Sequence, residues 1–250
     1  MVEFFKFSKA RIDEHTIKVG VDIRPVIECK LDRVKLFDVG QKLVDKYPNL
    51  FESLVQSPTE FLIRKEFIFP GKGEADLPTL AITPRGVVFI FPKILGAFQE
   101  EIQYENIDDI ILDGLKIFRG AFANKIFCRV GLVNEYIFNT GQDESVNLVC
   151  NRFTKIKVPT NGEILINTNF PDDDYNRKIR LQPMQKLEKD PNIPGIDQLS
   201  SYGVQVIVDF NNRDMTKDLD EGAMLRILHK ARQYNENELY DFLNGSFQGE

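Results

Sequence analysis

Residues 106–138 read NIDDIILDGLKIFRGAFANKIFCRVGLVNEYIF, and their pattern is the strongest indication of the fold class. Apolar side chains recur at helical intervals over residues 106–122. Asn106 is a candidate N-cap, and the aspartates at 108 and 109 suit the positive end of a helix dipole. Apolar and polar residues then alternate over residues 125–138, which is the period of a half-buried strand. We therefore expect a helix followed directly by a strand.

Similar patterns extend outward on both sides of this stretch. On the N-terminal side we expect a strand over 17–31 with a bend at Pro25. Apolar residues at helical spacing follow over 43–55, with a break or kink at Pro48. Strands over 61–69 and 80–91 should then form a hairpin or meander, with a turn at 84–86.

On the C-terminal side we expect a helix over 143–153 and then strands over 158–167 and 178–187, joined by the polar segment 171–175. A surface loop over 188–201 and a strand over 202–210 follow. The last element is a helix from about Asp218, where Asp218-x-x-Glu221 resembles a capping box.

The order of these elements predicts an α+β protein with mostly antiparallel or mixed sheets and helices packed on one face. Both parts of the chain follow strand, helix, two or more strands, helix. This parallel predicts an N-terminal half over 1–122 and a C-terminal half over 123–250 that ends in a long helix. A single mixed sheet with helices on one side fits the pattern equally well.

Composition and charge narrow the class of protein. The chain has 250 residues, of which 42% are hydrophobic and 28% charged, as in ordinary globular proteins. Its net charge of -6 argues against nucleic acid or a membrane surface as the main ligand, because both attract surplus Lys and Arg.

The longest apolar run, residues 87–91, is far below the roughly 20 residues of a membrane span, and residues 1–20 do not resemble a signal peptide. Three widely separated cysteines predict neither a disulfide framework nor a zinc site. We therefore expect a cytoplasmic protein.

Three segments resemble a sporadically distributed family of uncharacterised prokaryotic proteins. Residues 25–31 are similar to its opening strand, in which a Pro precedes two apolar residues and a Glu. Residues 129–139 are similar to a Gly-Leu-Arg-Tyr-Ile-Asn strand, although residues 133–135 interrupt the pattern and the Arg is missing. Residues 206–210, followed by Leu228-His229 and then by Tyr240-Asp-Phe-Leu243, are similar to its last strand and helix. The resemblance implies an α+β fold in two halves and a scattered distribution typical of accessory or mobile-element genes; it implies no activity, substrate or site.

The sharpest hint of catalysis is Glu28-Cys29-Lys30 within an apolar strand. Metal-dependent nucleases place Glu-x-Lys on a strand after an upstream Asp to hold a divalent ion and a water. Asp13 or Asp22 would supply that carboxylate, but Asp22 lies only six residues upstream with a proline between, which leaves little room for a hairpin. A strand with one solvent face also produces Glu-x-Lys by chance, because the motif is short.

The remaining candidates favour structural interpretations. His229, on the last helix, is expected beside the core stripe in a hydrogen bond, rather than as a catalytic base. Asp172-Asp173-Asp174 is typical of a solvated turn, since consecutive side chains point in different directions. No phosphate-binding or dinucleotide motif is present, so we expect no cofactor and no metal.

Our leading hypothesis is a non-enzymatic interaction module that binds another protein, or a second copy of itself, within a bacterial accessory or defence-type system. The expected contact surfaces are the ends of the sheet and the loop from Pro191 to Pro194. The alternative is a metal-dependent nuclease or phosphodiesterase that uses Glu28 and Lys30.

Overall fold

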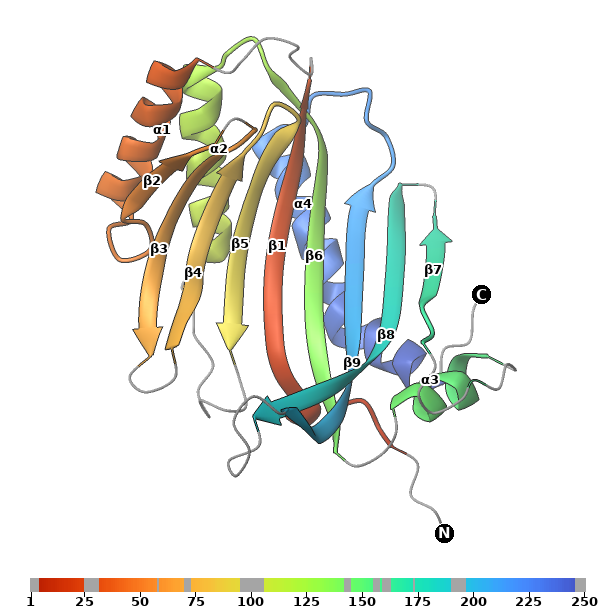
Figure 1. The fold of residues 1–250 in the computed structure, drawn as a ribbon. Coiled ribbons are helices and arrows are strands. Elements are labelled where there is room, and N and C mark those ends of the chain that lie inside the picture. Colours follow the sequence, from red (N-terminus) through yellow and green to blue (C-terminus); the bar gives the residue numbers. More distant parts are fainter. Residues whose placement is uncertain are drawn as a thin grey trace.

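The computed structural model describes residues 5–24, 32–57, 59–69, 73–94, 106–141, 145–154, 158, 163–172, 174–189 and 197–245. Within them, nine strands form one antiparallel sheet in the order β2-β3-β4-β5-β1-β6-β9-β8-β7 (Figure 1). The strands are β1 (Ile12–Arg24), β2 (Ser53–Gln56), β3 (Phe61–Phe69), β4 (Gly73–Ile82), β5 (Gly86–Ile94), β6 (Ile126–Gly141), β7 (Ile166–Pro171), β8 (Tyr175–Lys189) and β9 (Asp197–Asn212). The helices are α1 (Arg33–Lys46), α2 (Ile107–Ala121), α3 (Ser145–Phe153), α4 (Glu221–Gln233) and α5 (Leu239–Leu243), with a π-helical turn, Tyr234–Glu238, between the last two.

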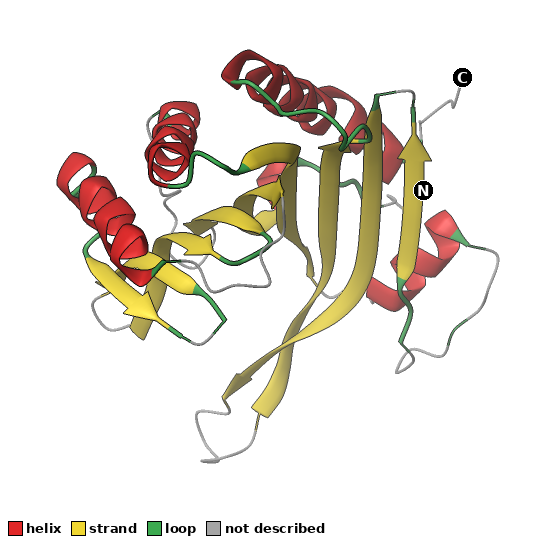
Figure 2. Cartoon of the chain, turned by 90° about the horizontal axis from the view of Figure 1, so that it is seen from above, coloured by secondary structure: helices red, strands yellow, loops and turns green. Residues whose placement is uncertain are grey.

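The predicted α+β class is confirmed, and every strand pair is antiparallel rather than mixed. Helices α1, α2 and α4 cover one face of the strongly twisted sheet (Figure 2). The core lies between them and that face, where alternate residues such as Val19 and Val21 of β1 and Val130 and Leu132 of β6 are buried. None of the described helices has the length and apolarity needed to cross a membrane.

The sheet continues across residue 123, the predicted boundary between halves. Its two central strands are β1 and β6, which pair from Ile12 opposite Phe138 to Arg24 opposite Ile126. β1 pairs with β5 on its other side, and β6 pairs with β9. The backbone hydrogen bonds of one sheet therefore join the two parts of the chain.

The strands predicted over 61–69 and 80–91 belong to a meander of β3, β4 and β5. The expected turn is confirmed, since Thr83 and Gly86 bond each other's backbone. A Cβ at Gly86 would lie 2.5 Å from the carbonyl oxygen of Val21 in β1. Glycine at this turn therefore permits β5 to approach β1.

The prediction of helical spacing through residue 55 was wrong in its second part. α1 ends at Lys46, two residues before Pro48, because proline disfavours the helical conformation of the residue before it. Leu54 and Val55 instead lie in β2 and pair with β3. Apolar spacing alone did not distinguish the two structures, because four residues fit either period.

Two boundaries in the C-terminal part also differ. The strand predicted from residue 158 begins at Ile166, and much of the predicted loop 188–201 is strand, because β8 and β9 pair out to Lys189 opposite Asp197. Residues 190–196, with the predicted contact loop, lie outside the described residues. Backbone pairing overrode the polar composition of these strand ends. The helix predicted over 143–153 is confirmed as α3.

The predicted cap of the last helix was wrong, whereas Asn106 takes the predicted N-cap position of α2 without a side-chain bond. α4 is capped by Asp220, whose side chain accepts a bond from the Ala223 backbone, whereas Asp218 accepts from the Phe127 backbone at 3.0 Å. Asn106 does precede α2 but makes no side-chain cap bond; it has a φ of 53°, in the left-handed region that asparagine tolerates. Asp218 therefore ties α4 to the sheet instead of starting the helix.

Candidate functional site

The residues of the predicted nuclease site are not brought together where the structure describes them. Asp13 and Asp22 lie at opposite ends of β1, about 30 Å apart along an extended strand. Asn139 donates to Asp13 at 3.1 Å, and Arg129 donates to Asp22 at 3.3 Å. Glu28 and Lys30 lie outside the described residues. Within the described ranges, no three His, Cys, Asp or Glu side chains are grouped to hold a metal ion. The nuclease hypothesis stays a prediction.

His229 lies on the solvent side of α4, which corrects the expectation that it borders the core. Its neighbour Leu228 is buried, together with Ile227 and Ala231. Consecutive helical residues are about 100° apart, so the residue after Leu228 turns away from the sheet.

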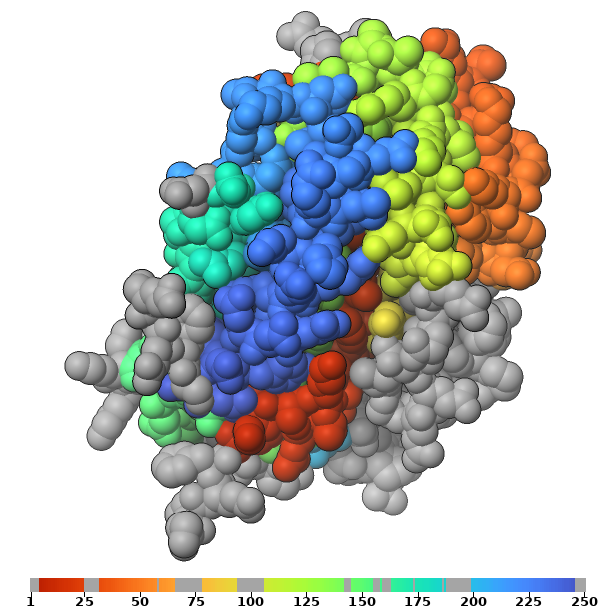
Figure 3. All heavy atoms as spheres, turned by 180° about the vertical axis from the view of Figure 1, so that it is seen from behind, coloured from red at the N-terminus to blue at the C-terminus, as the bar shows by residue number. Residues whose placement is uncertain are grey.

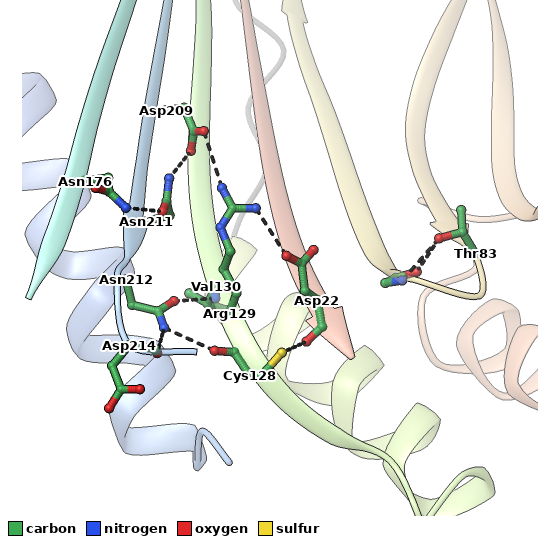
Figure 4. A network of polar contacts seen from close by, with 11 residues as sticks. Asp22, Thr83, Cys128, Arg129, Val130, Asn176, Asp209, Asn211, Asn212 and Asp214 are labelled. Carbon is green, nitrogen blue, oxygen red and sulfur yellow. Dashed lines mark hydrogen bonds and ion pairs between the residues drawn. The ribbon is translucent and has the colours of Figure 1, made fainter. Parts of the chain in front are cut away.

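Arg129 is at the centre of a polar network on the sheet face opposite α1, α2 and α4 (Figure 4). Its guanidinium lies 3.3 Å from Asp22 on β1 and 3.5 Å from Asp209 on β9, and Asn211 donates to Asp209 at 2.9 Å. The network joins three adjacent strands, and the single guanidinium of Arg129 is shared by two carboxylates. We interpret the network as a structural contact that holds the three strands together rather than as a reactive centre, because both carboxylates are already paired with Arg129.

A cleft of about 670 Å³ opens on the opposite, helix-bearing face. Its floor is the centre of the sheet, with Ile17 of β1 and Leu132 of β6, and its walls are the first turn of α2 and the π-helical turn. In Figure 3, red atoms from the N-terminal part of the chain are visible between the blue C-terminal helices and the yellow-green α2. The cleft therefore lies over the β1–β6 junction, between segments far apart in sequence.

Two stacked aromatic rings form part of this floor. His15 lies on Tyr136 with ring centroids 4.4 Å apart and planes 19° from parallel. A 2.8 Å hydrogen bond joins His15 Nε2 to Asn134 Oδ1. Burial raises the pKa of Tyr136, and the nearby Tyr240 and Glu236 add to the effect. The phenol therefore stays protonated at neutral pH.

An ion pair connects the two walls of the cleft. Both nitrogens at the end of Arg232 donate to the carboxylate of Asp108, one of them at 2.5 Å. Hydrogen bonding to Asp108 raises the pKa of Arg232 against the effect of burial. The pair fixes α2 relative to α4.

Asn235 is a buried polar residue beside the cleft. It belongs to the π-helical turn, a feature that often occurs at functional sites. The residue borders the cleft but is only 6% exposed. Neither its Nδ2 nor its Oδ1 has a hydrogen-bond partner in the described structure. No pattern in the sequence points to this residue, because one turn of π-helix is too short to show a period of its own.

A second surface lies where β8 and β9 extend past their neighbours as a twisted two-stranded ribbon, which we call the β8–β9 arm (residues 186–189 and 197–201; Figures 1 and 2). Leu187 pairs with Leu199 across the arm. These side chains are 57% and 44% exposed, unusually open for leucine. The predicted contact residues Pro191 and Pro194 lie between these strands in the sequence and outside the described residues.

Comparison with known proteins gives no relative from which a function could be transferred. No family model, no curated protein and no solved structure matches this chain. Membership of the prokaryotic family stays a prediction, and the functional argument rests on geometry.

Proposed function

We propose that this protein is a non-enzymatic interaction module that binds another protein through the β8–β9 arm. The observation that carries the proposal is the exposed cross-strand pair Leu187 and Leu199. Side chains directly opposite each other in antiparallel strands lie about 5 Å apart, so the two leucines form one apolar contact surface.

A partner would gain hydrophobic energy by covering this pair. Full burial of one leucine side chain contributes about 1.5–3 kcal/mol. Only about half of each leucine side chain is still exposed and can be covered by a partner. Covering both would therefore contribute about 2 kcal/mol, which is the size of an interface hot spot. An isolated two-stranded ribbon is also marginally stable in water, so a partner would order the arm.

The strand order supports the further proposal of two similar halves. β1 and β6 lie side by side at the centre, and each is followed along the chain by a helix and then by antiparallel strands. The last strand of each series, β5 or β9, lies beside the strand that begins it, β1 or β6. That the partner belongs to a bacterial accessory or defence-type system rests on the family resemblance alone.

The test places a photo-crosslinking amino acid at position 187 and identifies crosslinked protein from native extract by mass spectrometry. The purified partner is then titrated against the unaltered protein, the double variant Leu187→Asp/Leu199→Asp and the control Leu165→Asp, whose leucine is 49% exposed outside the arm. We expect the double variant to bind at least about tenfold more weakly, because 2 kcal/mol exceeds the 1.4 kcal/mol of a tenfold change. The control should bind normally.

Equal binding by the double variant would refute the arm as the contact surface. Light scattering of the purified protein distinguishes the other occupant. A dimer that the double variant abolishes and Leu165→Asp retains would assign the arm to self-association instead.

A further inference from the structure

The hydroxyl of Tyr136 is a polar group in the cleft that has no partner within the described residues. Tyr136 lines the cleft and is only 5% exposed. Its hydroxyl makes no hydrogen bond in the described structure, yet it is not among the unpaired polar atoms that this structure encloses completely. The exposed part of the side chain therefore includes the hydroxyl, which a molecule in the cleft can reach.

Two further oxygen-bearing side chains lie close to this hydroxyl. Tyr240 and Glu236 line the same cleft. Burial raises the pKa of Tyr136 most, and negative charge on Tyr240 or Glu236 raises it further, which requires both to be near. Neither the Tyr240 hydroxyl nor the Glu236 carboxylate has a hydrogen bond or ion pair in the described ranges. The three side chains therefore form one open group of hydrogen-bond acceptors.

The other wall of the cleft carries a second carboxylate without an ion pair. Asp109 belongs to the first turn of α2 and has no hydrogen-bond or ion-pair partner among the described residues. Arg232 already forms an ion pair with the neighbouring Asp108. The other two cations of the described lining, Lys9 and Lys93, pair with neither Asp109 nor the carboxylate of the opposite wall. A cationic ligand would supply the missing partners.

The floor between the two walls suits an alkyl chain. It includes the aliphatic side chains of Ile17 and Leu132, and Ile107 lines the wall beside Asp109. Methylene groups gain free energy when they leave water for such a surface. The volume of about 670 Å³ lies within the usual range for small-molecule sites, roughly 300–1,000 Å³.

We propose that the cleft binds an aliphatic polyamine, whose ammonium groups pair with Glu236 and Asp109 and whose alkyl chain lies along the apolar floor. An ammonium group has several N–H donors and no acceptor, which matches the oxygens of Glu236, Tyr136 and Tyr240. Anions would be repelled by both carboxylates. The cleft shares no residue with the β8–β9 arm, so this proposal does not depend on the proposed protein partner.

Isothermal titration calorimetry with spermidine at low ionic strength tests the ligand class on the unaltered protein. A ligand of this size is expected to bind with a Kd on the order of 0.1 mM. Added sodium chloride should weaken binding, because salt screens the ion pairs. The matched control is triethylene glycol, an uncharged chain with the same number of chain atoms, which should not bind at these concentrations.

Two variants test the carboxylates. We expect Glu236→Gln and Asp109→Asn each to bind spermidine about tenfold more weakly, because each removes a charge-assisted hydrogen bond. Asp241→Asn removes the same charge at an exposed position outside the cleft and should bind normally. This control separates a local site from attraction to the net negative charge of the protein.

The variant Tyr136→Phe tests the hydroxyl and keeps the ring that stacks on His15. We expect it to bind spermidine about threefold more weakly or worse. Its melting temperature without spermidine should equal that of the unaltered protein, because no protein group loses a hydrogen bond.

Four results would overturn the proposal. The first is a Kd for spermidine weaker than about 1 mM at low ionic strength. The second is equal binding of triethylene glycol. The third is unchanged binding by Glu236→Gln or Asp109→Asn relative to Asp241→Asn. The last is a lower melting temperature of Tyr136→Phe without spermidine, which would show that the hydroxyl has a structural partner.

Discussion

The side chain of Asn212 bonds to the backbone of β6 where the pairing of β6 with β9 ends. Replacement of Asn212 by leucine therefore tests how this end of the sheet is held together. The regular pairing of β6 with β9 begins at Gly131 opposite Asn211. Beyond it, Asn212 Oδ1 accepts from the Val130 backbone at 2.8 Å, and Nδ2 donates to the Cys128 carbonyl at 3.2 Å (Figure 4). The amide therefore replaces a missing strand partner.

The cost of Asn212→Leu follows from these contacts. Val130 is fully buried and Cys128 is 1% exposed, so water cannot replace the lost bonds. Two orphaned backbone groups at about 1–3 kcal/mol each cost about 2–6 kcal/mol. Nδ2 also bonds the carbonyl of Asp214, but that residue is exposed, and water takes over this bond. Burial of the added apolar surface offsets part of the loss by about 1.5 kcal/mol. We expect a net loss of about 0.5–4.5 kcal/mol.

Urea titration followed by circular dichroism measures this loss, with Asn237→Leu as an exposed control that should stay within about 0.5 kcal/mol of the unaltered protein. Hydrogen exchange should also show a faster Val130 amide in the Asn212 variant. A loss below about 0.5 kcal/mol, with an unchanged Val130 exchange rate, would refute the view that this side chain completes the sheet.

Two further predictions concern other polar contacts. Asn244 accepts from the Phe7 backbone at 2.9 Å and donates to its carbonyl at 3.0 Å, so Asn244→Leu should lower the free energy of unfolding by about 2 kcal/mol and speed exchange of the Phe7 amide; no change in either would contradict this. Burial acts to raise the pKa of Asp113, yet hydrogen bonds from Lys46 and Tyr47 lower it below its ordinary value. The resulting stabilisation is complete above the unfolded pKa of about 4 and is lost as the pH falls through the folded pKa. Asp113→Asn should therefore lose less stability than the unaltered protein between pH 5 and pH 2 in thermal unfolding scans, and identical pH profiles would argue against it.

The elements with a long, regular period were predictable from the sequence. α2, β3 and β6 appear close to their predicted positions, because a helix or strand of nine or more residues that faces one core must repeat its apolar side chains at a fixed interval. Short segments could not be predicted from the sequence. The four residues of β2, for example, match a strand or the continuation of a helix equally well.

The candidate site was much less predictable. Asp108 was identified only for its place in the first turn of α2, and its partner Arg232 lies 124 residues away. Asn235 and His15 lie in segments without a motif, and the strand pattern around Tyr136 does not indicate that its ring stacks on His15. Their proximity depends on how β1, β6 and the last helices pack, which no local pattern encodes.

Periodicity and capping preferences act within a few residues, so the amino-acid sequence alone was enough to predict an α+β protein with a helix near residues 107–121 and a strand directly after it. The pairing of β1 with β6 became visible only in the folded chain, where one sheet runs through the described residues and its centre forms the floor of a cleft. The two kinds of information differ in the distance along the chain over which they act. Side-chain spacing reports which face of an element is buried, whereas strand partners are chosen by hydrogen bonds and packing between residues more than a hundred positions apart.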